Sequence, residues 1–218
     1  MKKLLGILGM FMLVSVVATP AHAISLTLSD GVNTVTCTDG AACDINGSGG
    51  AVTFVGSVGN FTFNITTAIT YPILGTQDAA ELDISSLNVS SSGAGTLTIK
   101  AVQGGFTGPV DGGFTSIKTA VGGTTTGSVS FESYLNSTLL ASTGDLTGPA
   151  FSTTSSATVP FPGPFSITAQ ADITHLTAGA TSFDLHVSPV PEPSVLLLMG
   201  SGFIGLSFWG RKRLNGAK

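Results

Sequence analysis

Residues 165–187 carry the clearest structural pattern in the chain, with the sequence FSITAQADITHLTAGATSFDLHV. In residues 165–176 apolar side chains alternate with polar ones, so every second side chain falls on the same face of an extended strand. Residues 178–180 contain a glycine and predict a turn. Residues 181–187 then alternate again. The pattern predicts two β-strands, each with one buried face and one polar face.

The same alternation recurs along the chain between turn-forming residues. Asp30-Gly31 separates two such runs, which is a strong hairpin signal. Tyr71-Pro72 is expected to end a strand, residues 96–99 to pair back on residues 82–89, and residues 124–134 to form one long strand. The other predicted strands are residues 24–28, 32–37, 51–55, 60–69, 137–141 and 150–159.

These runs predict about nine or ten strands with turns between them. Phe61, Phe63 and Ile65 are expected to share the buried face of one strand. Parallel sheets need crossover helices, and no run has helical periodicity. The predicted fold class is therefore all-β, with an antiparallel β-sandwich ectodomain over residues 24–189, and a β-barrel is the alternative.

The N-terminus has the plan of a secretory signal peptide. Lys2 and Lys3 precede an apolar run over residues 4–18, and Ala21 and Ala23 supply small side chains for a cleavage site. We expect residues 1–23 to engage the Sec translocon and signal peptidase to cut after Ala23. A transmembrane anchor is the alternative, but the run is short for a bilayer.

Charge is distributed unevenly along the chain. Residues 24–193 contain two lysines, Lys100 and Lys118, and twelve acids, which give a formal charge of −10. Nucleic-acid binding requires clustered Lys and Arg that displace the counterions of phosphates. We therefore expect no nucleic-acid partner, and a soluble surface outside the cell.

The two cysteines, Cys37 and Cys43, both lie in the part expected to be exported. An exported pair at this spacing predicts a disulfide that closes a small loop. Zinc is the alternative, but the spacing is not C-x2-C and further ligands are scarce.

Two histidines, His175 and His186, lie near the acids Asp172 and Asp184. Asp172 and His175 are three positions apart, so a strand directs them to opposite faces, whereas Asp184 and His186 share a face that we expect to be solvated. A serine nucleophile needs a base and a group that orients the base, and no G-x-S-x-G elbow is present. We expect no catalytic residue and no enzymatic activity.

The densest acidic group is Asp78, Glu81 and Asp83, at the entry to a predicted strand. A carboxylate pair of a glycosidase is one interpretation, and a solvated loop is the simpler one. Asp39 and Asp44 flank the cysteine loop, without the D-x-D-x-D-G pattern of a calcium loop. We expect no metal ion and no cofactor.

The C-terminal region, residues 190–218, combines three features in order. Val-Pro-Glu-Pro at residues 190–193 precedes an uncharged apolar segment at residues 194–209, and Arg211, Lys212 and Arg213 follow. The segment is somewhat short for a relaxed transmembrane helix, and the positive-inside rule places the basic residues in the cytoplasm. We expect a membrane helix with a basic stop.

Together, Pro191, Glu192 and Pro193, the apolar segment and the basic cluster resemble the PEP-CTERM protein-sorting signal of Gram-negative bacteria that make extracellular polysaccharide. The resemblance implies recognition of these three residues by an exosortase, a membrane cysteine protease or transpeptidase. It also implies anchoring in the inner membrane before processing, and then delivery to the cell surface or extracellular matrix. Permanent anchoring remains the alternative.

We therefore expect an exported protein with a structural or adhesive role in an exopolysaccharide or biofilm matrix, where extracellular polysaccharide is a partner. A carbohydrate-binding module is the second hypothesis, although the expected ectodomain has only Tyr71 and Tyr134 for an aromatic platform and Trp209 lies in the tail. A secreted hydrolase is the third hypothesis.

Overall fold

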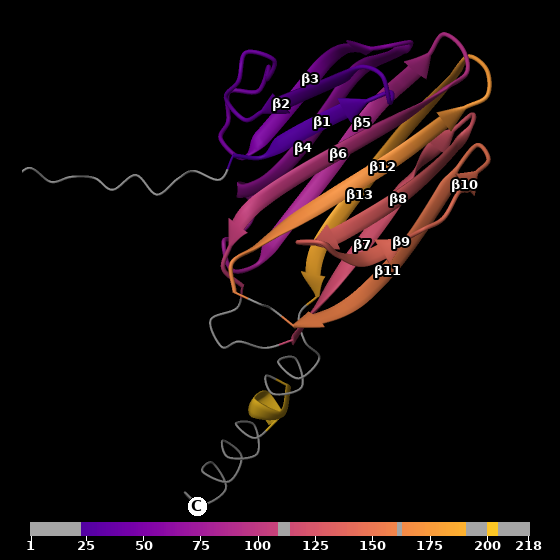
Figure 1. The fold of residues 1–218 in the computed structure, drawn as a ribbon. Helices are drawn as coiled ribbons and strands as arrows, with labels where there is room; N and C mark the ends of the chain where they lie inside the picture. Colours follow the sequence, from indigo (N-terminus) through magenta and orange to yellow (C-terminus); the bar gives the residue numbers. More distant parts are fainter. Residues whose placement is uncertain (1–22, 109–113, 161–162, 191–199, 205–218) are drawn as a thin grey trace, which may run out of the picture.

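The computed structural model describes residues 23–108, 114–160, 163–190 and 200–204. Thirteen strands account for most of this part of the chain (Figure 1). They are β1 (Ser25–Ser29), β2 (Thr34–Thr38), β3 (Ala51–Val58), β4 (Phe61–Gly75), β5 (Ala80–Ser91), β6 (Gly95–Phe106), β7 (Phe114–Thr125), β8 (Ser128–Leu135), β9 (Thr138–Ser142), β10 (Leu146–Thr147), β11 (Phe151–Pro160), β12 (Phe165–His175) and β13 (Gly179–Val190).

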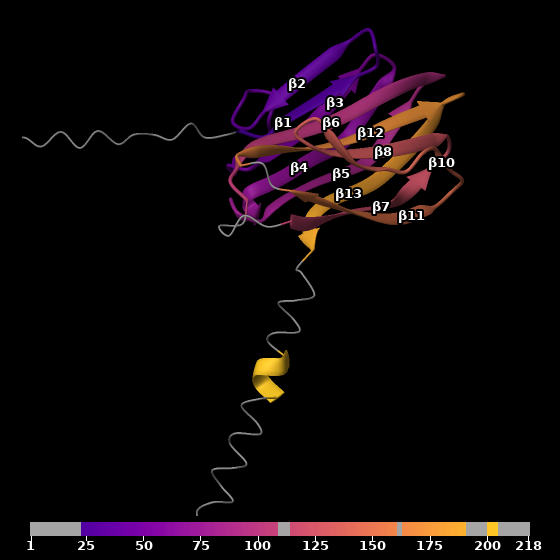
Figure 2. The same ribbon diagram turned by 60° about the horizontal axis from the view of Figure 1, so that its bottom comes forward.

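The strands form two antiparallel sheets. Sheet A has seven strands in the order β10-β8-β12-β6-β1-β2, and β9 also pairs with β8. Sheet B has six strands in the order β11-β7-β13-β5-β4-β3. The two sheets lie face to face (Figures 1 and 2), so the predicted antiparallel sandwich is confirmed.

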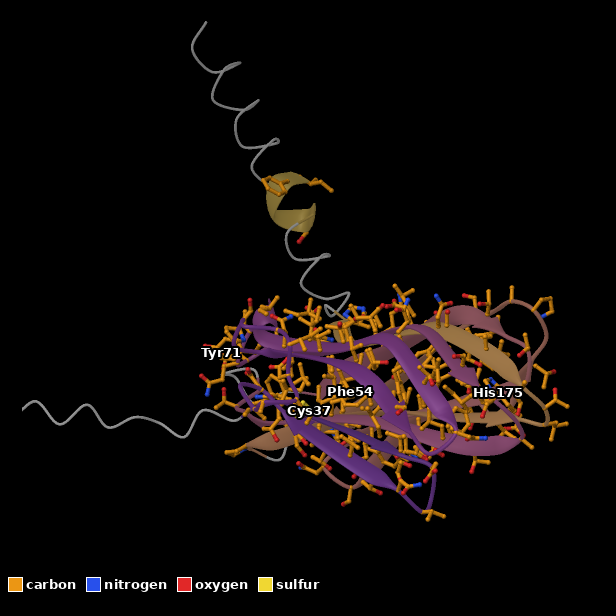
Figure 3. All side chains as sticks on the ribbon, turned by 90° about the horizontal axis from the view of Figure 1, so that it is seen from above. Cys37, Phe54, Tyr71 and His175 are labelled. Atoms are coloured by element: carbon orange, nitrogen blue, oxygen red, sulfur yellow. A yellow bond between two sulfur atoms is a disulfide. The ribbon has the colours of Figure 1, made fainter. Side chains whose placement is uncertain are left out.

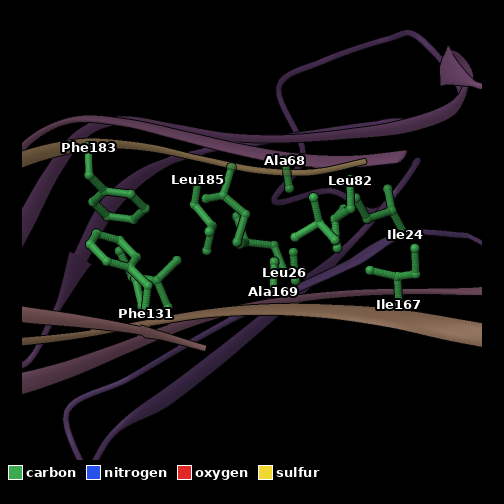
Figure 4. Packing of buried hydrophobic residues seen from close by; sticks show 14 of the residues in the cluster. Ile24, Leu26, Ala68, Leu82, Phe131, Ile167, Ala169, Phe183 and Leu185 are labelled. Carbon is green, nitrogen blue, oxygen red and sulfur yellow. The ribbon is translucent and has the colours of Figure 1, made fainter. Parts of the chain in front are cut away.

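The core lies between the sheets and is filled by the alternating apolar positions. Phe131 of sheet A and Phe183 of sheet B meet with ring centroids 5.2 Å apart, and Leu185 and Ile167 are fully buried (Figure 4). Burying one such side chain contributes roughly 1.5–3 kcal/mol. The same pleat that buries these residues leaves their neighbours on the solvent faces.

The predicted long strand over residues 124–134 is wrong. The chain forms β7 as far as Thr125, leaves sheet B at Thr126 and Gly127, and enters sheet A as β8. A Cβ at Gly127 would overlap the carbonyl oxygen of Thr174. Glycine therefore allows the close crossing between the sheets, and it is the sequence signal for the break.

The predicted pairing of residues 96–99 with residues 82–89 is also wrong. β5 pairs with β4 and β13 in sheet B, whereas β6 pairs with β1 and β12 in sheet A. A turn between two alternating runs predicts a reversal of the chain, but a reversal into the opposite sheet leaves the same sequence pattern. By contrast, the hairpin at Asp30-Gly31 is confirmed, with Ser29 opposite Thr34.

β4 differs from its prediction in two places. It continues past the cis Tyr71-Pro72 bond to Gly75, although its pairing with β5 is interrupted after Thr70. An irregularity in the pairing of β3 with β4 also changes the alternation, so Ile65 is not on the face of Phe61 and Phe63 and is only half-buried.

The sandwich has two ends, named here the Tyr71 end and the His175 end (Figure 3). β13 begins beside Ser91, which contacts His175, and runs to Val190 at the Tyr71 end. Ala23 also lies at the Tyr71 end, in contact with the same cleft as Tyr71. The chain therefore enters β1 and leaves β13 at the same end of the sandwich, the Tyr71 end.

Residues 200–204 are helical. Within the ranges that the structure describes, no helix has the length and apolar character needed to cross a bilayer. The predicted apolar helix over residues 194–209 lies mostly outside these ranges.

Candidate functional site

His175, at the end of β12, lies inside a closed network of hydroxyl groups. Its Nδ1 atom is 2.8 Å from the Ser91 hydroxyl, and its Nε2 atom is 2.9 Å from the Thr181 hydroxyl. Thr181 in turn lies 2.7 Å from the Thr125 hydroxyl. The imidazole is only 2% exposed, and this burial lowers the pKa of His175. The network joins β12 of sheet A to β5, β13 and β7 of sheet B.

This network lacks the parts of a hydrolytic triad. As predicted, Asp172 lies on the opposite face of β12, where it accepts hydrogen bonds from Thr98 and Gln170. Both imidazole nitrogens already have a hydroxyl partner. A cavity of about 350 Å³ borders His175 and is also lined by Asp145. The imidazole therefore connects the two sheets, and no carboxylate in a described contact orients it as a base.

A second group of ionisable side chains gathers on the outer face of sheet B. Strand pairing places His186 opposite Asp83 and puts its Nε2 atom 3.3 Å from Glu81. Burial, and then the nearby Asp184, raise the pKa of Asp83 to about 6, against the opposing effect of His186. Sequence reasoning treated the acids and the histidine separately, because 105 residues separate Glu81 from His186.

The third acid of the predicted group, Asp78, is directed elsewhere. It accepts a hydrogen bond of 2.5 Å from the Thr107 hydroxyl. Among the described residues, no three His, Cys, Asp or Glu side chains are grouped in a way that could hold a metal ion. The outer face of sheet B therefore presents a histidine–glutamate pair beside the two carboxyl groups of Asp83 and Asp184.

The predicted disulfide is confirmed, because Cys37 and Cys43 are bonded, with their Cα atoms 5.7 Å apart. The two acids that flank this loop organise the backbone around it. Asp44 accepts hydrogen bonds from the N–H groups of Gly40 and Thr53, and Asp39 accepts one from Gly50.

An open cleft of about 790 Å³ lies at the Tyr71 end. Its apolar lining includes Tyr71, which is 41% exposed, and Phe106, which packs against Phe165 with ring centroids 5.6 Å apart. Its polar lining includes Asp39 and Gln77. The remaining lining residues are Ala23, Gly49, Gly50, Pro72, Gln103, Gly104, Gly105, Thr107 and Pro164.

The walls of this cleft come from segments that are far apart in the sequence. One wall is the loop between β4 and β5, where Gln77 donates to the Gly105 carbonyl and accepts from the backbone N–H of Thr107. Another wall is the Tyr71-Pro72 segment, against which Gly50 packs. The cleft volume lies within the range of roughly 300–1,000 Å³ that is typical of small-ligand sites. Sequence reasoning named Tyr71 and Asp39 but had no signal that would bring them together.

The predicted sorting residues Pro191, Glu192 and Pro193 lie outside the described residues, as do Arg211, Lys212, Arg213 and Ala21. Ala23 is described and exposed, directly before the fully buried Ile24. At the other end of the chain, β13 is hydrogen-bonded to β7 as far as Val190. The predicted sorting motif thus begins at the residue that follows a strand of the sandwich.

Comparison with known families agrees with the interpretation of the tail. Residues 189–213 match the family model of the PEP-CTERM protein-sorting motif. A comparison with curated protein sequences gives no match for the chain. The motif supports export, and anchoring in the membrane before an exosortase sorts the protein. The chain therefore carries, at residues 189–213, a segment that matches the PEP-CTERM protein-sorting motif.

Proposed function

We propose that this chain is a non-enzymatic protein of the cell surface or extracellular matrix, with a structural or adhesive role among extracellular polysaccharides. In this proposal the signal peptide exports it, the C-terminal segment holds it in the inner membrane, and an exosortase then releases the sandwich. The observation that carries the proposal is the match of residues 189–213 to the sorting motif, which begins at the last two residues of β13.

The outer face of sheet A supports an adhesive role. Hydroxyl side chains form exposed cross-strand pairs there, with Thr27 3.3 Å from Thr36 and Ser29 2.8 Å from Thr34. Hydroxyl groups both donate and accept hydrogen bonds, as the hydroxyls of a neutral polymer do. Such a surface suits many weak contacts with a polymer.

The histidine network supports the proposal that the chain is not an enzyme. His175 is buried, and both of its ring nitrogens are bonded to hydroxyl groups, so the cavity that borders it meets an imidazole already engaged in the network. The outer cluster of Glu81, Asp83 and His186 lies on the face of a sheet, outside the two cavities described above.

The test is mass analysis of the protein recovered from the envelope and the culture medium of its native host. We expect a mature N-terminus at Ile24, and a C-terminus that lacks residues 211–218. Replacing Pro191 and Glu192 by alanine should leave the intact chain in the membrane fraction, and Pro160→Ala should behave as the wild type does. A released product that retains residues 211–218, or normal release of the double variant, would contradict the proposal.

A further inference from the structure

We propose that the cleft at the Tyr71 end is a binding site for a neutral saccharide. The proposal builds on the adhesive role proposed above and gives that role a defined site and a ligand class. It rests on three properties of the cleft: the chemistry of its lining, the way its walls are fixed, and its charge.

The lining combines the two kinds of group that a sugar ring requires. A pyranose has an apolar C–H face and a rim of hydroxyls. Tyr71 offers an exposed aromatic ring beside Pro72, and aromatic rings present large apolar faces at a small entropic cost. The Asp39 carboxylate and the Gln77 amide lie in the same cleft, and they can accept and donate hydrogen bonds to hydroxyls.

The walls are held in place by contacts between the two sheets. Thr107, at the end of β6 in sheet A, donates to Asp78 and to the backbone of Gln77 in the loop after β4 of sheet B. Thr70 donates to the Glu81 carbonyl and so fixes β4 directly before Tyr71. Walls fixed in advance lower the entropic cost of binding.

Gly50 joins the disulfide loop to the Tyr71 wall. Its N–H group donates to Asp39 at 2.6 Å, and its carbonyl accepts from the N–H of Thr70 at 2.8 Å. A Cβ at this position would lie 2.6 Å from Pro72 Cδ, so only a glycine allows the backbone at residue 50 to lie this close to the Tyr71-Pro72 segment. Gly50 therefore links the segment that carries Asp39 to the segment that carries Tyr71.

The charge of the cleft selects for a neutral ligand. Among the described lining residues, Asp39 is the one carboxylate, and none is Lys, Arg or His. Cleavage after Ala23, which also lines the cleft, would place the α-amino group of Ile24 at its edge, and this single positive charge would offset the Asp39 carboxylate. Residues 24–193 carry a formal charge of −10 from two lysines and twelve acids. An anionic sugar such as a uronate would be repelled, because like charges interact unfavourably in a partly desolvated site.

The test uses the full chain in a detergent without a sugar headgroup, with signal-peptide removal verified by mass. Cellohexaose, laminarihexaose and mannohexaose are the neutral probes, hexagalacturonate is the anionic probe, and saturation-transfer NMR and calorimetry measure binding. We expect at least one neutral probe to bind and hexagalacturonate not to bind.

The variants locate the binding to the cleft. Tyr71→Ala and Gln77→Ala should each weaken affinity by about tenfold or more, which corresponds to ~1.4 kcal/mol. Tyr71→Phe should keep most of the affinity, because it keeps the ring. The matched control is Tyr134→Ala, since Tyr134 donates to Glu132 on the outer face of sheet A, away from the cleft.

No binding of any neutral probe to the folded wild-type chain would overturn the proposal. Equal binding of hexagalacturonate would overturn it too, as would an equal loss in the Tyr71→Ala and Tyr134→Ala variants. The proposed function is tested by tail processing in the host, which does not depend on this cleft. A correctly sorted protein that binds no neutral saccharide would therefore refute the binding site alone.

Discussion

At the His175 end, the imidazole exposes 2% of its surface and bonds to the hydroxyls of Ser91 and Thr181, whereas at the Tyr71 end the tyrosine is 41% exposed and borders an open cleft. Both ends gather polar and aromatic side chains from several strands. At the His175 end these groups satisfy one another, so the arrangement serves stability. At the Tyr71 end the side chains surround solvent, so the arrangement can serve a ligand.

The largest effect is expected at the His175 end. His175→Ala should destabilise the protein by about 3 kcal/mol, because it removes two buried hydrogen bonds and leaves a cavity between the sheets. His186→Ala, on the outer face, should change stability by less than about 0.5 kcal/mol. Urea denaturation of the full chain measures both. Equal midpoints for the two variants would show that the buried network does not stabilise the sandwich.

The next effect concerns the wall of the cleft. Gly50 and Gly31 have nearly the same φ, +89° and +88°, but a Cβ at Gly50 meets Pro72, whereas a Cβ at Gly31 meets no atom within 4 Å. Gly31→Ala should cost about 1 kcal/mol for its backbone conformation alone. Gly50→Ala should cost roughly 1 kcal/mol more, about 2 kcal/mol in all, because overpacking is added. An equal loss of stability in both variants would contradict this expectation, because it would mean that the Tyr71-Pro72 segment moves at little cost to make room for the added methyl group.

Removing the disulfide should lower the stability of the protein by as much as Gly50→Ala does, or by less. Replacing Cys37 and Cys43 by serine should cost about 2 kcal/mol, at the low end of the range for disulfides, because the closed loop is short. Thermal denaturation of the double variant measures this cost. Adding a reductant to the wild type should reproduce the loss, and should leave the variant unchanged. A wild-type midpoint that does not respond to complete reduction would contradict this expectation.

The smallest effects depend on pH and have opposite signs at the two sites. Burial lowers the pKa of His175, so below its ordinary value of about 6.5 the unfolded chain binds more protons and stability falls as pH falls. The pKa of Asp83 is raised from 3.8 to about 6, so between these values the folded chain binds more protons and stability rises as pH falls.

Two variants separate these contributions. Asp83→Asn should be more stable than the wild type at neutral pH, and this advantage should shrink as pH falls from about 6 to about 4. The His175→Gln variant should not show the decrease in stability that the wild type shows as pH falls below about 6.5. Melting temperatures measured across this pH range test both expectations. An advantage of Asp83→Asn that grows at low pH would show that the sign assigned to Asp83 is wrong.

The sequence predicted the sandwich because alternation with period two follows directly from the strand pleat, and burial of one face leaves a pattern that is visible over residues 165–187. The disulfide followed from the export signal and the spacing of two cysteines. The sheet that each strand joins was not predictable, since β5 and β6 have the same alternation whether they pair or separate. The passage from β7 in sheet B to β8 in sheet A does have a local signal in the sequence, which is Gly127.

The cleft required information that no local pattern contains. Its walls come from the disulfide loop, from β4 and from the end of β6, and Tyr71 of sheet B meets Asp39 and Phe106 of the sheet A side only because the two sheets pack face to face. The position of Glu81 beside His186 has the same origin, through the pairing of β5 with β13.

The position of β13 also has a consequence for when the protein folds. β13 ends at Val190, yet it lies inside sheet B, with β7 on one side and β5 on the other. In the proposed export, sheet B cannot close until residue 190 has crossed the membrane, and non-local pairing of this kind forms slowly. The last strand would then emerge directly ahead of most of the segment that matches the sorting motif, residues 189–213. Completion of the fold would thus be coupled to the arrival of the segment that sorts the chain.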